Sequence, residues 1–115
     1  MIATIAPGSF RHKLEIQQRL LAADGFGGRS ESWVHHKFVW ALVEPRESFR
    51  VGEGLSLVSG ATHVVTIRED RSLPLQFRFV LAGRIFQVLH GHDPDETGRY
   101  RACQCREFAT GDDAP

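Results

Sequence analysis

The sequence predicts an all-β protein: a small six-stranded β-barrel or sandwich with a long flexible loop or a short helix between the second and third strands. Most segments alternate apolar and polar residues with a period of two, which is typical of half-buried strands. Short turns rich in Gly, Asp and Pro separate these segments. The 115-residue chain is 42% hydrophobic, enough for one core. We expect one domain over residues 10–107, with an N-terminal tail of residues 1–9 and a C-terminal tail of residues 108–115.

The first two strands are expected at residues 10–22 and 32–45. In the first, Leu14 and Ile16 share a face, and a helix is the alternative because Leu, Gln, Arg and Ala favour helices. In the second, β-branched and aromatic residues indicate a strand that Pro45 ends. Strict alternation puts one set of its side chains on one face: Trp33, His35, Lys37, Val39 and Ala41. The other face is expected to carry Val34, His36, Phe38, Trp40 and Leu42.

The stretch DGFGGRSESW, from Asp24 to Trp33, connects these two strands. Phosphate-binding glycine loops lie between a strand and a helix, whereas the segment that follows here alternates like a strand. Neither G-x-G-x-x-G nor a following Gly-Lys-Ser/Thr is present. Asp-Gly and Gly-Gly supply the positive φ angles that tight hairpins need. We therefore interpret the stretch as a hairpin turn.

The second half of the chain contains the remaining four strands. Residues 46–60 form the connection, with one or two helical turns possible near residues 46–52 and three glycines that favour a mobile loop. Residues 62–69 alternate as the third strand, and residues 75–91 form a hairpin around Ala82-Gly83. Residues 92–98 are a polar turn. Residues 99–108 form the last strand, with Cys103 and Cys105 on one face.

Charge and cysteine usage exclude several classes of protein. The net charge is zero and the pI is near 7, so no overall field attracts nucleic acid or an anionic membrane. Two cysteines one residue apart on a strand are poorly placed for a disulfide. There is no secretory pattern and no apolar run of about 18 residues. We expect a soluble protein without membrane contacts, made in a reducing cytoplasm.

The polar residues do not predict an enzyme, a metal site or a cofactor. His90 and His92 near the two cysteines lack the spacing of a Cys-x-x-Cys pair or a His-Glu-x-x-His helix. No G-x-S-x-G elbow supplies a nucleophile. In the segment Phe77-Arg78-Phe79 the two rings share a face opposite the arginine, which favours a core strand over an oligonucleotide-stacking platform.

Six motifs in order give the chain a resemblance over residues 10–107 to the phage head–tail joining family, the connector proteins of tailed phages and gene transfer agents. RHKLEIQQ is similar to that family's opening strand, and DGFGGRSESW to its D-x-[YF]-G-G…E-x-W turn. VWALVEP and ATHVVTIRE resemble its W-A-x-V-E-P and T-H-x-[VI]-x-I-R strands. AGRIFQV resembles its G-R-x-[FY]-x-[IV] hairpin, and DPDETGRYRACQCRE its D-P…C-R-E ending.

The resemblance implies a β-barrel that assembles into a homo-oligomeric ring, commonly of twelve subunits, at the neck of a virion or phage-like particle. Such a ring lies between a portal or adaptor protein and a tail terminator or tail tube protein, closes the head, and lets double-stranded DNA pass without sequence specificity. Phe26, at the hairpin tip, is expected to be covered in the ring by a neighbouring subunit or by the adjacent layer. The connecting loop is expected to make assembly or channel contacts through Arg46, Glu47, Phe49, Arg50, Leu55 and Leu57. The alternative is a monomeric barrel that binds nucleic acid or another ligand.

Overall fold

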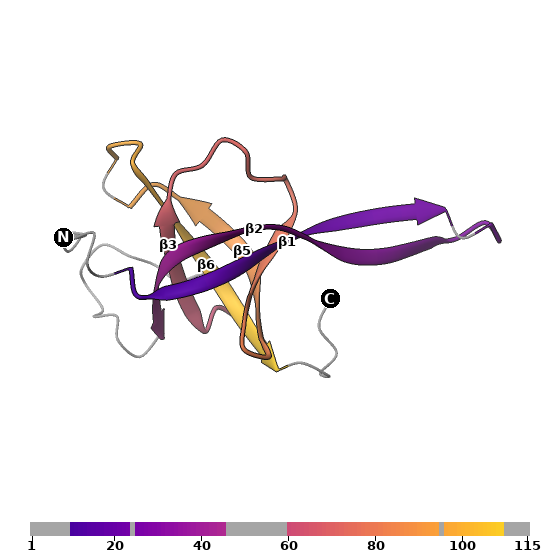
Figure 1. Cartoon of the computed structure of the whole chain (residues 1–115), viewed down its shortest axis with the longest axis horizontal. Coiled ribbons are helices and arrows are strands. Elements are labelled where there is room, and N and C mark those ends of the chain that lie inside the picture. The colour runs from indigo at the N-terminus through magenta and orange to yellow at the C-terminus, as the bar shows by residue number, and fades with distance from the viewer. Residues whose placement is uncertain (1–9, 24, 46–59, 95, 110–115) are drawn as a thin grey trace.

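The computed structural model describes residues 10–23, 25–45, 60–94 and 96–109, and within them the fold is all-β (Figure 1). It contains six strands: β1 (His12–Ala23), β2 (Arg29–Pro45), β3 (His63–Arg68), β4 (Phe77–Leu81), β5 (Arg84–His92) and β6 (Tyr100–Ala109). All pair antiparallel, in the order β1-β2-β3-β6-β5-β4, and β4 pairs with β1 to close a barrel. The all-β prediction is confirmed, and the closed order selects a barrel over a sandwich. No helix able to span a membrane occurs among the described residues.

The connection between β2 and β3 lies mostly outside the described residues, which resume at Gly60. The choice between a flexible loop and a short helix in that connection therefore stays a prediction. The predicted hairpin around Ala82-Gly83 is confirmed: both residues have positive φ, 47° and 83°, and β4 and β5 pair on either side of them. Positive φ at both central positions matches the right-handed twist of the flanking strands.

The core fills the barrel with side chains from all six strands. Ten buried residues form one cluster: Leu14, Ile16, Ala41, Val65, Ile67, Phe77, Phe79, Phe86, Cys103 and Cys105. The predicted faces of β1 and β4 are confirmed, since Leu14 and Ile16 point inward and Arg78 lies on the outer side of Phe77 and Phe79. Burial raises the pKa of the Cys103 thiol to about 12, so both cysteines act as small core residues.

A β-bulge in β2 changes which side chains face outward. Ile16 pairs with Lys37 and Gln17 with His35, so His36 has no Cα partner on β1. The bulge corrects the prediction of strict alternation over residues 33–42, because it moves Trp33 and His35 to the outer face that carries Phe38 and Trp40. The rings of His35 and Phe38 accordingly lie 4.9 Å apart.

The β1–β2 hairpin is much longer than the barrel requires. β4 pairs with β1 only from Glu15 to Gln18, and β3 pairs with β2 only from Ala41 to Pro45. The end of the hairpin, residues 19–33, therefore projects from the barrel as a two-stranded arm (Figure 1). The arm lies along the longest dimension of the molecule, whose extents are 51 × 26 × 24 Å.

Candidate assembly surface

The arm begins where Arg19 leaves the barrel, and ionic contacts fix this base. Arg19 forms an ion pair with Glu31 across the hairpin, with Nη2 and Oε2 2.7 Å apart. Arg19 also donates from Nη1 to the Gln76 side chain at 3.2 Å, and its backbone N–H donates to the Gln76 carbonyl. Trp33 donates from Nε1 to the other Glu31 oxygen at 3.0 Å. These contacts join the two arm strands to each other at the base of the arm, and Arg19 joins them to Gln76, just before β4.

Trp33 and Arg78 connect the arm to the outer face of β4. The Arg78 guanidinium lies over the Trp33 ring, 4.3 Å from its centroid, and its Nε donates to the Gln17 side chain at 2.8 Å. Partial burial lowers the pKa of Arg78, although the carboxylates of Glu31 and Glu15 oppose this effect. Trp33 can make this contact because the bulge at His36 turns it to the same face as Arg78.

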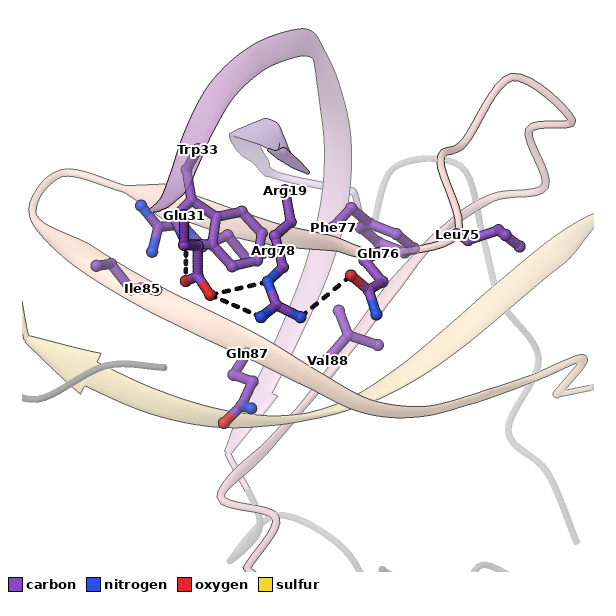
Figure 2. Close-up of a pocket in the computed structure, with 10 residues that line it drawn as sticks. All are labelled: Arg19, Glu31, Trp33, Leu75, Gln76, Phe77, Arg78, Ile85, Gln87 and Val88. Carbon is purple, nitrogen blue, oxygen red and sulfur yellow. Dashed lines mark hydrogen bonds and ion pairs between the residues drawn. The ribbon is translucent and has the colours of Figure 1, made fainter. Parts of the chain in front are cut away.

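These residues line a pocket of about 300 Å³ at the base of the arm (Figure 2). One wall carries the arm residues, and Figure 2 shows Arg19 held between Glu31 and Gln76. The opposite wall comes from β5, with Ile85, Gln87 and Val88. The pocket combines apolar side chains with two guanidinium groups and one carboxylate, a composition that suits binding of a protein side chain.

The β1–β2 hairpin also carries most of the large hydrophobic side chains that are exposed among the described residues. Eight large hydrophobic side chains are exposed among the described residues, and six of them lie on this hairpin: Leu20, Leu21, Phe26, Val34, Phe38 and Trp40. Exposed apolar residues concentrated on one element indicate a surface that binds other chains. A two-stranded hairpin is also marginally stable alone in water, so the arm would gain stability from a partner.

Phe26 lies in the turn at the tip of the arm, 95% exposed. Gly25 and Gly27 on either side of it have φ of 83°, a conformation that favours glycine and that holds the turn. The predicted hairpin connection is thus confirmed, since β1 and β2 pair up to Ala23 and Arg29 at its two ends. The other predicted contact residues, Arg46, Glu47, Phe49, Arg50, Leu55 and Leu57, lie outside the described residues.

The other polar clusters lie on the barrel. Glu107 accepts hydrogen bonds from Arg84 Nε at 2.7 Å and Nη2 at 3.1 Å, and its pKa is lowered by them. Lys37 contacts Asp70 in the loop after β3. The rings of His90 and His92 stack 5.9 Å apart. Among the described residues, no three His, Cys, Asp or Glu side chains lie close enough to hold a metal ion.

Apart from Phe26, the pocket residues and the exposed apolar side chains of the hairpin were not predicted from the sequence. The signal that could have indicated the arm is strand length, because β1 and β2 have 12 and 17 residues while β3 and β4 have six and five. Strands in globular proteins average five to six residues, so the excess must extend beyond the sheet that shorter neighbours form. The pocket had no such signal, since its residues come from four separated segments.

The fold of this chain is similar to those of proteins whose structures have been solved. One chain from a structure described as the virion of a native gene transfer agent particle has 26% sequence identity and a TM-score of 0.64; the match covers 86% of this chain and 96% of that chain. The solution structure of a protein from Shigella flexneri 2a has 23% identity and a TM-score of 0.67, covering 96% and 100%, and shares the fold. No curated protein matches the chain.

The family model described as phage head completion protein matches residues 5–107, and the chain belongs to this family. This confirms the resemblance found in the sequence motifs. The protein is therefore a phage-type structural protein with a role in joining head and tail.

Proposed function

We propose that the chain is the repeating subunit of a ring at the neck of a phage or phage-like particle, where it closes the filled head and offers the docking surface for the tail. The observation that carries the proposal is the apolar β1–β2 hairpin, which gives a barrel from this family a large surface to bury against other chains. The related chain from the gene transfer agent virion supports a location within a particle.

A closed ring needs the same heterologous contact repeated around an axis, so each subunit must present two different patches. The arm and the barrel supply two surfaces of different shape, a projecting convex tip and a concave pocket at the base. The number of subunits implied by the family resemblance is twelve.

The ring encloses double-stranded DNA that passes without sequence specificity. The chain has no net charge, and this supports passage because strong phosphate binding would hold the DNA back. The portal or adaptor protein lies on the head side and the tail terminator or tail tube protein on the tail side. The subunit is synthesised in the bacterial cytoplasm and acts structurally, without catalysis or cofactor.

The loop of residues 46–60 contributes assembly or channel contacts through Arg46, Glu47, Phe49, Arg50, Leu55 and Leu57. Deleting residues 47–59 tests this assignment, because β2 ends at Pro45 and β3 begins at His63, so the deletion removes no residue of a paired strand. We expect a folded protein that no longer attaches tails to filled heads. Tailed, infectious particles made with the deletion variant would contradict the loop assignment.

The experiment that tests the function itself removes the chain from a particle-producing strain. We expect filled heads and free tails to accumulate separately, and the wild-type chain supplied in trans should restore joining. Salt-dependent binding of the isolated chain to short oligonucleotides, together with normal tailed particles in its absence, would instead support the monomeric nucleic-acid-binding barrel.

A further inference from the structure

Of the exposed apolar side chains on the hairpin, Phe26 differs from the rest in shape and position. Phe38 and Trp40 lie on the outer face of β2, where Phe38 already contacts Lys13 and His35. Phe26 stands at the end of a projecting arm, between two glycines that add no side chains of their own. A tip of this shape can enter a concave site, which a sheet face cannot do.

The pocket at the base of the arm has the chemistry to receive an aromatic ring. The guanidinium of Arg19 is held by hydrogen bonds to Glu31 and Gln76, and because guanidinium donors lie in the plane of the group, these bonds do not use its two flat faces. Aromatic rings stack on such faces, as Trp33 already does with Arg78. Ile85 and Val88 on the opposite wall supply the apolar contacts that a phenyl ring needs.

We propose that the Phe26 side chain of one copy inserts into the pocket between Arg19, Trp33, Arg78 and Ile85 of the next copy. This inference rests on the proposed ring and specifies its contact. The contact is heterologous, tip to base, so each copy both donates and receives an arm, and repetition around an axis closes the ring.

The test cross-links one copy to the next inside assembled particles. Gly28→Cys places a thiol beside the tip, where φ does not require glycine, and keeps Phe26 in place. Gln87→Cys places a thiol in the pocket on another copy. The two variants are produced together in one strain and treated with a short bismaleimide linker. The native Cys103 and Cys105 are buried with raised pKa values, so they do not compete.

We expect a covalent dimer from this pair, and none when Trp40→Cys, on the flat face of β2, replaces Gln87→Cys. Adding Phe26→Ser to the Gly28→Cys chain should abolish the product, because burial of a phenylalanine side chain is worth roughly 10- to 100-fold in association. A dimer that persists with Phe26→Ser overturns the proposal. Particles that contain the chain but give no 28–87 product overturn the contact and leave the ring standing. Absence of the chain from particles overturns both.

Discussion

Replacing Phe79 with alanine should strongly destabilise the barrel, and the same replacement at Phe26 should not. Phe79 is fully buried, lies opposite Ile16 on β1 and Phe86 on β5, and makes an edge contact with Phe77 at 5.5 Å. Truncation of such a residue removes its apolar burial and leaves a cavity that the closed sheet cannot fill by moving one strand. Phe→Ala changes of this kind cost about 3–5 kcal/mol.

For a domain of this size, that loss corresponds to a fall in melting temperature of roughly 12 to 25 °C. Phe26 is 95% exposed, so its replacement by alanine should change the free energy of unfolding by less than about 0.5 kcal/mol. Comparing Phe79→Ala with Phe26→Ala therefore distinguishes an aromatic ring that contributes to folding from one that is available for assembly.

Urea unfolding followed by tryptophan fluorescence measures both variants, since Trp33 and Trp40 lie on β2, one on the arm and one on the barrel. The slope of the free energy against urea should stay unchanged, because each variant unfolds the same sheet. A loss of less than about 1 kcal/mol for Phe79→Ala, or an equal loss for Phe26→Ala, would refute this description of the core.

Three further changes follow from the charges and thiols. Burial raises the pKa of Glu44, so its carboxylate form destabilises the fold at neutral pH. Glu44→Gln should therefore be more stable than the wild type at pH 7, and this gain should shrink as the pH falls through the raised pKa. The hydrogen bonds from Arg84 lower the pKa of Glu107, so the stabilisation by its carboxylate is present at neutral pH and lost on acidification. Glu107→Gln should cost about 1 kcal/mol or less at pH 7. Melting curves of the Glu44 and Glu107 variants from pH 3 to 8 check the direction of both pH dependences. Cys103 and Cys105 should resist maleimide until the protein unfolds, and labelling of the native barrel by mass spectrometry would contradict their burial.

The strands could be predicted because one side of each faces a single core. Alternation at Leu14 and Ile16, and again at Phe77 and Phe79, corresponds directly to inward-pointing side chains. The turn at Ala82-Gly83 could be predicted because a two-residue connection needs positive φ. Strand alternation and turn type depend only on residues that are close together in the sequence, so both can be recognised without a structure.

The proposed assembly surface could not be predicted in the same way. Alternation does not show an inserted residue, so the bulge at His36 was missed, and with it the outward position of Trp33 beside Arg78. Nor does it show which side of a strand is inward: on β2 the small Ala41 is buried and the large Trp40 is exposed, the reverse of what hydrophobicity alone would suggest. Such positions depend on which strands pair, a long-range property.

An electron-microscopy reconstruction of the neck of a particle that contains this chain tests the central claim most directly. We expect a closed ring of this barrel between the head and the tail, with the arm of each copy, residues 19–33, against the base of its neighbour's arm and DNA along the axis. A neck in which the chain is absent, or present as isolated copies whose arms contact no other chain, would contradict the account.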